Sequence, residues 1–573
     1  MQMTTSDFLI NAKNLTEIFN NLKNLYDVSE NIDEKTVKII NEIQKYGYLP
    51  YPHIKALEEL TPAQTILALE EKFKHNNVYN DKKFVFTKLS PLERAGIKDS
   101  SWITKEQHSI KLINLVALGD GNTDEQPAKF IDILKQILTL PAGNPENEVI
   151  STTMYIIPFH PREFGCAYLP TSTEVSPALE DKFIKEKLDL NAKQQVQLLL
   201  GFAQLAGHPI MYDVLPQTGR FAKSILANPH VARWFDIKSL INNVKSELEK
   251  IVNVQNEDES SVKEIISAHI DGNYVEIPEH LKELVLKIET ELEKSKKDLC
   301  EFMIKKENQQ ILHKKIKQLI NATAGYPPEK NLAEADINDQ SKIIGELISQ
   351  GLWPAPGGAW NSCGIPIFDK MSEGASYPKF KHYDIDGNDV THFANLDCQT
   401  PYYFVNLESG EYNDTVIDFY INSLKKLQKD YNFDGFRVDH IDHIVDKVSE
   451  DNGRPISYRA PRKVLGIANA ELKKQVSHFA ALAEYMLWDN FLKEYHQDMH
   501  FDVLWGSDII AQYQKTPFKI VEELKELEEY NKGLPEGCGR LSILKTYNNQ
   551  DGEFRAIDQY PGQLGENGAL FKY

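Results

Sequence analysis

The sequence has few cysteines and no long apolar run, and both absences narrow the classes of protein to which it can belong. Its five cysteines are odd in number, are never spaced as CxxC, and lie far apart, at Cys166, Cys300, Cys363, Cys398 and Cys538. This pattern argues against a disulfide framework and against a structural zinc site, and it is typical of a reducing compartment. No stretch approaches the roughly 20 apolar residues that a membrane span needs. The N-terminus MQMTTSDFLINAKNL lacks a basic region followed by an apolar run, so no signal peptide is visible. We therefore expect a cytoplasmic protein with no membrane partner.

Positive charge is also in deficit, because 64 Lys and Arg stand against 84 Asp and Glu, a net charge of −20. Such a surface repels phosphate, which argues against sequence-independent binding to nucleic acid or anionic lipid. The chain also lacks a glycine-rich phosphate loop, so a phosphate-dependent barrel enzyme is not favoured. Neutral ligands meet no such repulsion. Hydrophobic residues at 41% of a 573-residue chain suffice for a sizeable core and exclude wholesale disorder.

From residue 109 onward, short apolar runs alternate with amphipathic helical segments. We predict seven strands, over 110–118, 152–159, 208–215, 433–439, 479–485, 501–506 and 541–548. Repeated strand–helix units with continuous apolar strands indicate a parallel sheet covered by helices. The expected fold is therefore α/β, a (β/α)8 barrel of the TIM type. An eighth strand is not visible, and we expect a truncated barrel rather than a strand supplied by the first hundred residues or by another chain.

Two segments fall outside this strand–helix rhythm. Residues 1–105 are polar and predict a helical N-terminal region, which leaves 106–573 for the catalytic barrel. An insertion over 220–412 interrupts the barrel after its third strand. Its charged first half predicts a helical hairpin with a narrow apolar seam, and a partner-binding coiled coil is the alternative, which leaves a protein partner open. Its second half is rich in Gly, Pro, Trp and Tyr, as substrate loops at the carboxyl end of a barrel are.

Three acidic residues stand at or just beyond predicted strand ends, where barrel active sites are built: Asp439, Glu484 and Asp551. Arg437 lies two residues before Asp439, so strand alternation places both side chains on one face. A cation beside a carboxylate keeps it ionised, as a nucleophile must be, and a second carboxyl in a drier setting can hold a proton. This pairing is the apparatus of retaining glycoside hydrolysis, which requires two carboxyl groups roughly 5–5.5 Å apart. Taken singly, each acid is more often a surface or helix-capping residue.

The sequence segments around these acids resemble the strand motifs of the alpha-amylase family, glycoside hydrolase family 13, which is related to the 4-alpha-glucanotransferases. The segment DGFRVDHIDH, residues 434–443, matches the family's fourth-strand pattern with Arg, Asp and His at the required offsets. Weaker matches follow the family's order, at Tyr212-Asp213-Val214-Leu215 for the third strand, Ala483-Glu484-Tyr485 for the fifth and Asn549-Gln550-Asp551 for the seventh. Tyr168 is the nearest match to the Tyr that stacks on the sugar. The resemblance covers about residues 109–573.

The resemblance implies a nucleophile at Asp439, a general acid/base at Glu484 and a transition-state stabiliser at Asp551. It implies substrate contacts from Arg437, Asp213, His443, Tyr168 and Gln550. The implied function is a retaining hydrolase or transglycosidase that acts on α-linked glucans, such as maltooligosaccharides or glycogen- and starch-type chains, through a covalent glycosyl-enzyme intermediate. An inactive amylase-like barrel that binds carbohydrate or another protein is the alternative.

The sequence departs from the family pattern at two histidines. The third-strand His is replaced by Thr218 and the seventh-strand His by Gln550. Loss of the third-strand His is shared with the amylomaltases, which are 4-alpha-glucanotransferases, so hydrolysis and transfer both stay open.

No metal or cofactor is expected. His440 and His443 lack the distant third ligand of a zinc site. The alternating acids of residues 384–389 suggest a calcium loop, but its twelfth position is Asn395 rather than Glu, so a solvated turn is favoured over calcium. Three tryptophans could either stack on glucose rings or pack in the core, namely Trp353, Trp360 and Trp505.

Overall fold

The structure is a computed structural model. It describes residues 12–28, 33–50, 57, 59–104, 109–118, 130–142, 152–162, 166–270, 275–355, 380–385, 388–393, 399–406, 408–441, 444, 459–484, 492–505, 517–536 and 538–544.

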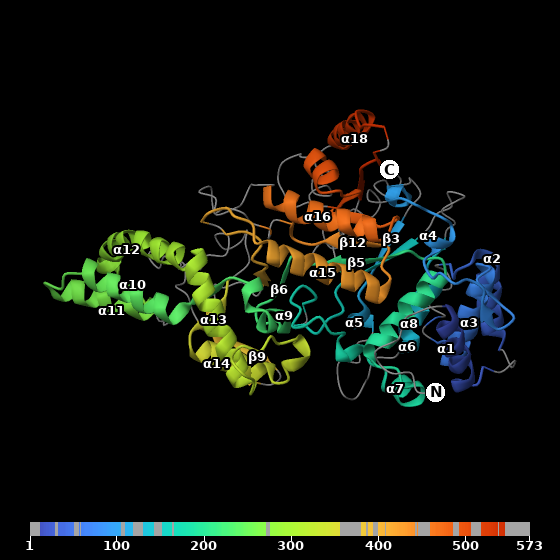
Figure 1. Ribbon diagram of the computed structural model, residues 1–573, viewed down its shortest axis with the longest axis horizontal. Coiled ribbons are helices and arrows are strands. Elements are labelled where there is room, and N and C mark those ends of the chain that lie inside the picture. Colours follow the sequence, from blue (N-terminus) through green and yellow to red (C-terminus); the bar gives the residue numbers. More distant parts are fainter. Residues whose placement is uncertain are drawn as a thin grey trace.

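A parallel sheet of seven strands forms the centre of the molecule (Figure 1). The strands are β3 (Ser109–Ile113), β4 (Thr152–Ile156), β5 (Ile210–Val214), β12 (Gly435–Val438), β13 (Ala480–Glu484), β14 (Val503–Trp505) and β15 (Ser542–Leu544). Each strand pairs with the next one along the chain, so the order in space is the order in sequence. A sheet wound in one direction in this way fits a (β/α)8 barrel, whereas a doubly wound sheet reverses its strand order at one point. The seven predicted strands and their parallel arrangement are confirmed.

The described strands are shorter than the sequence predicts, and β3 departs furthest from its predicted bounds. The run IKLINLVAL was expected to be extended over 110–118, but β3 ends at Ile113 and residues Leu115–Leu118 form the short helix α5. A continuous apolar run has no periodicity that separates a buried strand from a buried helix, so its end could not be placed. Among the described residues, β3 and β15 are the two edges of the sheet. The N-terminal strands β1 (Tyr79–Asn80) and β2 (Lys83–Phe84) pair with each other instead of joining it.

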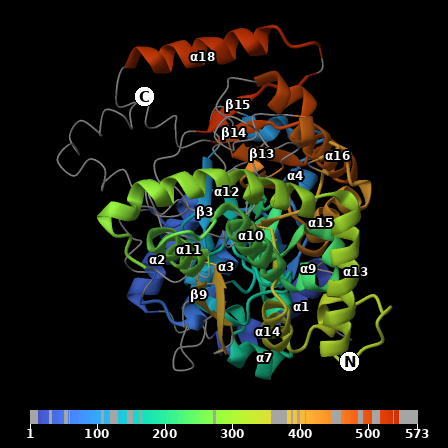
Figure 2. The same cartoon turned by 90° about the vertical axis from the view of Figure 1, so that its left-hand side faces the viewer.

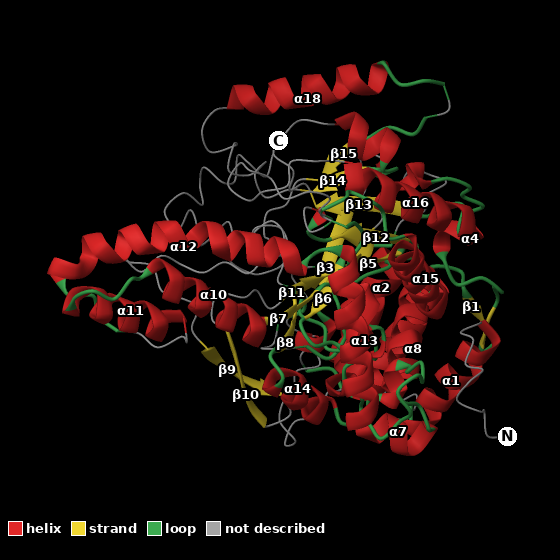
Figure 3. Ribbon diagram, turned by 60° about the vertical axis from the view of Figure 1, so that its left-hand side comes forward, coloured by secondary structure: helices red, strands yellow, loops and turns green. Residues whose placement is uncertain are grey.

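The helices that follow successive strands pack side by side. α6 (Phe130–Leu138) contacts α8 (Ala192–Leu205), α8 contacts α15 (Asp414–Tyr431), and α15 contacts α16 (Arg459–Gln475). Figure 3 shows α8, α15 and α16 together on one side of the strands. Two features favour helix α8 at this place in the chain. An Asn191 capping box begins the helix, and its residues 194–205 are all buried. This layer leaves the carboxyl ends of the strands to the loops.

The N-terminal helices α1 (Ala12–Leu25), α2 (Glu34–Tyr46) and α3 (Pro62–His75) share a core with the barrel helices. Phe19 and Phe73 pack on Phe202 of α8, with ring centroids 5.5 and 5.8 Å apart. The following segment, with α4 (Pro91–Arg94) and a 3-10 turn (Ser100–Thr104), lies at the amino ends of the strands. There the Trp102 indole donates to the His478 carbonyl at 2.7 Å. The segment with α4 and the 3-10 turn is thus attached to the end of the sheet opposite the strand-end acids, while α1 and α3 pack on α8.

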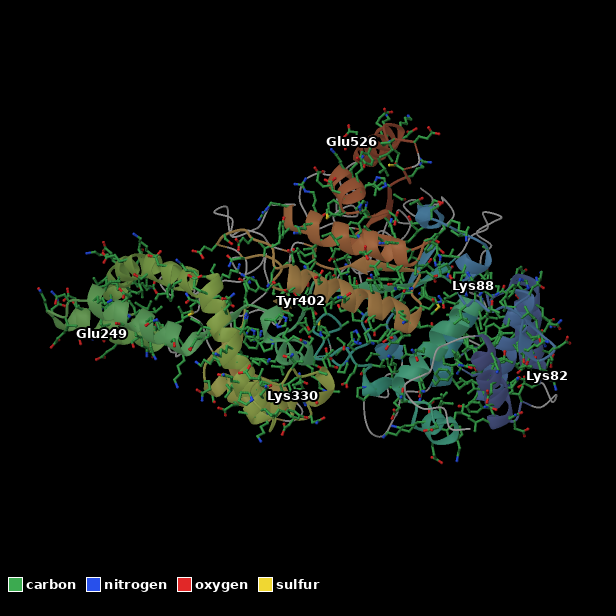
Figure 4. The ribbon with its side chains drawn as sticks, viewed as in Figure 1. Lys82, Lys88, Glu249, Lys330, Tyr402 and Glu526 are labelled. Atoms are coloured by element: carbon green, nitrogen blue, oxygen red, sulfur yellow. The ribbon has the colours of Figure 1, made fainter. Side chains whose placement is uncertain are left out.

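The segment between β5 and β12 contains α9 (Lys223–Ala227), α10 (Ile237–Ile251), α11 (Glu257–Ile270), α12 (Lys282–Met303), α13 (Lys306–Thr323) and α14 (Gln340–Ser349). Where a hairpin was predicted, three helices, α10, α11 and α12, pack on one another. They project from the molecule and face the viewer in Figure 2. Figure 4 shows Glu249 of α10 on this projection, and Tyr402 in the body of the molecule. The apolar seam is buried at Leu281, Val285, Ile288 and Leu292.

Three small antiparallel pairs complete the same segment: β6 (Gln217–Gly219) with β11 (Gln399–Pro401), β7 (Trp234–Asp236) with β8 (Leu352–Pro354), and β9 (Phe380–Ile385) with β10 (Asn388–Phe393). Trp353 of β8 is buried and packs on Phe221, with ring centroids 5.4 Å apart. The other tryptophan predictions concern Trp360 and the Trp505 side chain, which lie outside the described residues, as does Asn395. The chain also forms α7 (Lys182–Leu188) and α18 (Pro517–Lys532). No helix in the described part of the chain is both long and apolar enough to cross a membrane.

A buried lysine in α3 makes the stability of the fold depend on pH. Lys72 Nζ donates to the carbonyls of Gly47 and Leu140 at 2.8 and 2.7 Å, and burial lowers its pKa from 10.5 to about 7. Between these two values the unfolded chain binds more protons than the folded one, so stability rises with pH in this window. We expect the contribution of Lys72 to the free energy of unfolding to increase by about 2 kcal/mol from pH 7 to pH 9.

Chemical denaturation at pH 7, 8 and 9 tests this expectation. Lys72→Met should lose the increase, whereas Lys74→Met, which removes a partly exposed lysine of the same helix, should keep it. An equal rise in Lys72→Met and in the unsubstituted protein would show that Lys72 keeps its proton when folded.

Candidate active site

Three neighbouring strands bring acidic side chains to one edge of the sheet. Asp213 is the penultimate residue of β5, Asp439 directly follows β12, and Glu484 is the last residue of β13. β12 lies between the other two strands, with Arg437 opposite Asp213 in the register. The carboxyl ends of parallel strands meet at the same edge, so residues distant in sequence become neighbours there.

Arg437 lies at the centre of this group. Its Nη1 donates to both oxygens of Asp213 at 3.0 and 3.1 Å and to Oδ1 of Asp439, and its Nη2 pairs with Oε1 of Glu484 at 2.7 Å. The guanidinium side chain is only 1% exposed, so these contacts form away from water. One guanidinium therefore contacts three carboxyl groups, and the charge that remains is negative when the three groups are ionised. A group of this sign favours a ligand on which positive charge develops.

Two tyrosines fix Asp213. The hydroxyls of Tyr155, in β4, and Tyr168 both donate to its Oδ2, at 2.5 and 3.0 Å. Burial raises the pKa of Asp213 above its usual value, although Arg437 and the Tyr155 hydrogen bond oppose the shift. Burial likewise raises the pKa of both tyrosine hydroxyls, so they are donors at neutral pH. Tyr168 is thus next to the acidic group, as a substrate-contacting residue would have to be.

Besides Arg437, which contacts both groups, Asp439 and Glu484 each have a donor of their own. The backbone N–H of His440, a residue with φ of 44°, donates to Oε2 of Glu484 at 2.9 Å. The side-chain amide of Gln217 donates to Oδ2 of Asp439 at 3.3 Å. One oxygen of Asp439 and one of Glu484 lie within 4.8 Å of each other. The two carboxyl groups are therefore neighbours, as the retaining mechanism requires of its nucleophile and its acid/base.

The two carboxyls differ in acidity, in the opposite order from the one expected. Burial raises the pKa of Asp439 well above its usual value, and the charge of Glu484 adds to this effect while Arg437 opposes it. Burial alone would also raise the pKa of Glu484, but Arg437, His440 and the backbone hydrogen bond lower it overall. The Glu484 side chain keeps 16% of its surface exposed against 3% for Asp439. Glu484 is therefore the more acidic of the two in the ligand-free site.

Asp439, His440 and Glu484 form a group of potential metal ligands, with one atom from each within 4.8 Å of the others. Arg437, however, already contacts both carboxylates. A metal ion would have to displace this cation or share its ligands, so the arrangement favours the ion-pair network over a metal site.

The structure brings together five of the predicted site residues, namely Asp213, Arg437, Asp439, Glu484 and Tyr168. His443, Gln550 and Asp551 lie outside the described residues, so their roles stay predictions. Thr218, which stands in place of the family's third-strand His, is buried and donates to the Pro170 carbonyl at 3.4 Å.

Sequence reasoning missed Tyr155 and Gln217. Tyr155 is hidden in the apolar run TTMYIIPF, where an aromatic residue is typical of a buried strand. Gln217 lies four residues after Asp213 and directly before Thr218, which stands in place of the family's third-strand His. Its place within this motif was the available signal.

No family model matches the sequence, and no curated protein does either. Among solved structures, the chain is similar to a trehalose-6-phosphate hydrolase from Bacillus licheniformis, with 10% identity, a TM-score of 0.38, and 81% of this chain and 60% of that one covered. It is also similar to an alpha-amylase from Lactobacillus plantarum, with 10% identity, a TM-score of 0.34, and 79% and 65% covered. A noncanonic maltogenic alpha-amylase from Thermotoga neapolitana gives 10% identity, a TM-score of 0.30, and 76% and 58% covered.

The chain thus spans about three fifths of the length of these structures. Two of them are alpha-amylases by name.

Proposed function

We propose that the protein is a retaining glycoside hydrolase or transglycosidase that acts on α-linked glucans. The observation that carries the proposal is the buried Arg437, whose guanidinium contacts Asp213, Asp439 and Glu484 at the carboxyl edge of the barrel strands. The oxocarbenium-like transition state of glycoside cleavage is positively charged, and an excess of fixed negative charge stabilises it. The spacing of Asp439 and Glu484, within 4.8 Å, supports double displacement.

In the proposed first step, a carboxylate oxygen of Asp439 bonds to the anomeric carbon as the bond to the leaving sugar breaks, and the Glu484 proton passes to the leaving oxygen. In the second step, water or a sugar hydroxyl gives its proton to Glu484 and its oxygen to the anomeric carbon, which releases Asp439. Water gives hydrolysis and a sugar gives transfer. From the resemblance, Asp551 is proposed to stabilise the transition state, and His443 and Gln550 to contact the sugar. No metal or other cofactor takes part in these steps.

The proposal requires the proton to be on Glu484 when the substrate is bound, although Glu484 is the more acidic group in the ligand-free site. The side chain of Glu484 is the more exposed of the two, so a sugar seated against it removes more water from Glu484 than from Asp439. Loss of water raises the pKa of a carboxyl group. Substrate binding is therefore proposed to move the shared proton from Asp439 to Glu484.

A barrel that has lost catalysis is the alternative, with the projecting helices α10–α12 as its working surface. The ion-pair network favours the enzyme, because a site that only binds sugar or protein gains nothing from four ionisable groups in contact, three of them buried. Burial of charged groups tends to lower the stability of the fold, so a function is the reason to keep such a cluster.

Incubation with maltoheptaose tests the proposal. We expect chains other than seven glucose units to form, shorter ones alone for a hydrolase and both shorter and longer ones for a transferase. A proton NMR time course should show the α-anomer of the reducing-end product first, because two displacements restore the starting configuration. Unchanged maltoheptaose would contradict the enzyme proposal, and initial release of the β-anomer would contradict the retaining mechanism.

A further inference from the structure

Gln217 and Arg437 contact different oxygens of the proposed nucleophile. Arg437 binds Oδ1 of Asp439, and the Gln217 amide donates to Oδ2 at 3.3 Å. The two oxygens of Asp439 are therefore distinguished, one held by a cation and one by a neutral donor. Gln217 is 2% exposed, so water does not compete for this contact.

The backbone that carries Gln217 is fixed independently of Asp439. Gln217 begins β6, where it lies opposite Pro401 of β11. Gly219, two residues on, donates its N–H to the Pro170 carbonyl at 3.0 Å. A Cβ atom at this glycine would lie 2.5 Å from the same oxygen, so the absence of a side chain permits the approach. β6 thus holds Gln217 between the loop after β4 and the far end of the insertion.

The oxygen of the Gln217 side-chain amide, Oε1, indicates a ligand. This oxygen is buried and has no hydrogen-bond partner among the described residues. A buried acceptor without a donor is unfavourable, and native structures usually satisfy such atoms. No N–H or O–H donor of the described residues forms a hydrogen bond with this oxygen, so a ligand would have to supply the donor. A hydroxyl of a bound sugar is a neutral donor that meets this requirement without adding charge.

We infer that Gln217 is a positioning and specificity residue, which orients Oδ2 of Asp439 through its amide N–H and accepts a sugar hydroxyl at Oε1. This inference rests on the proposed function, because it assigns the roles within the same site. It gives the two ends of one amide two separate tasks. Substitutions that remove one end or both can therefore separate them.

Two variants make this separation. Gln217→Glu keeps the shape and an acceptor, and it replaces the permanent amide donor by a carboxyl group that loses its proton and becomes negative beside Asp439 as the pH rises. Gln217→Met has a similar length and loses both polar atoms. Thr400→Val is the matched control, because Thr400 is a buried residue of β11 whose hydroxyl lacks a partner in the described structure, and the change leaves the β6–β11 pairing in place. Thermal denaturation establishes that each variant is folded.

The pH dependence of kcat/KM reports on the donor. Asp439 is also faced by Arg437, Glu484, His440 and Asp213, which remain in all variants. Loss of the N–H donor disfavours ionised Asp439, so the acidic limb should move to higher pH in both variants, further in Gln217→Glu because it adds a like charge. At the optimum, kcat should fall about tenfold or more in both. An unshifted limb would overturn the positioning role, since a merely structural change lowers activity at every pH alike.

Calorimetric binding of maltotriose reports on the acceptor. We expect Gln217→Met to weaken binding about fivefold or more, and Gln217→Glu, which keeps an acceptor, to bind within about twofold of the unsubstituted protein. Equal affinity in all three would overturn the specificity role. The inference is wrong, and the proposed function stands, if the unsubstituted protein converts maltooligosaccharides and Thr400→Val and both Gln217 variants convert them equally well. If the unsubstituted protein neither binds nor converts them, both are wrong.

Discussion

Asp439→Asn and Glu484→Gln are each expected to lower kcat on maltooligosaccharides by at least about 10³-fold. Each replacement is nearly isosteric, so it removes a reacting carboxylate without opening a cavity. Asp439→Asn takes away the proposed nucleophile, and Glu484→Gln takes away the proton donor. Release of reducing ends and the distribution of chain lengths measure the loss.

Both variants should remain folded. Burial raises the pKa of Asp439, which means that its charged form is less favourable in the folded chain than in the unfolded one. The neutral amide that Asp439→Asn introduces should therefore leave the melting temperature unchanged or raise it. Asp418→Asn, on the exposed side of α15, removes the same charge away from the site and should keep full activity. More than a few per cent of activity in either acid variant would contradict the assignment.

Arg437→Met is expected to have the largest effect on stability, a loss of about 3–5 kcal/mol at pH 7. It removes the one guanidinium that contacts Asp213, Asp439 and Glu484 and leaves three carboxylates close together at a buried edge. Their pKa values should rise, so the unfolded chain would bind fewer protons than the folded one between the ordinary and the raised values. Stability of the variant should therefore recover as the pH falls from 7 toward 5.

Urea denaturation at pH 5 and pH 7 measures this effect. Arg437→Lys is the matched control, because it keeps the charge but cannot reproduce the fork of contacts, and it should fall between the unsubstituted protein and Arg437→Met. A loss that is the same at both pH values would show that packing, rather than charge, accounts for the role of Arg437.

The sequence predicts the sheet well because its central strands β4, β5 and β12 are buried on both faces. Such strands appear as continuous apolar runs between amphipathic helices, and all seven predicted strands are in the structure. Ends and local partners are harder to predict. The helix at Leu115–Leu118 has no periodicity that separates it from β3. The break between α10 and α11 lies within a charged segment, where it could not be distinguished from a continuous helix, so a hairpin was predicted in place of three helices.

The same division applies to the site. Arg437, Asp439 and Glu484 could be identified because parallel strands align their carboxyl ends, so position in a strand predicts position in space. Asp213 was identified through the resemblance of its segment to the family's third-strand motif. Tyr155 and Gln217 could not, because their roles depend on contacts from neighbouring strands and from the insertion. The order of acidity of Asp439 and Glu484 also depends on their exposure and on the His440 backbone donor. Neither can be deduced from the spacing of residues in the sequence.

The most direct test of the account is to identify the residue that becomes glycosylated. Glu484→Gln treated with α-maltotriosyl fluoride should form a covalent intermediate, because fluoride leaves as an anion without a proton donor, and the missing base slows the attack of water on the intermediate. Digestion and mass spectrometry should then find the maltotriosyl group on Asp439, and Asp439→Asn treated in the same way should carry none. A maltotriosyl group on another residue, or an unmodified Glu484→Gln that still releases fluoride with inversion, would contradict the proposed mechanism.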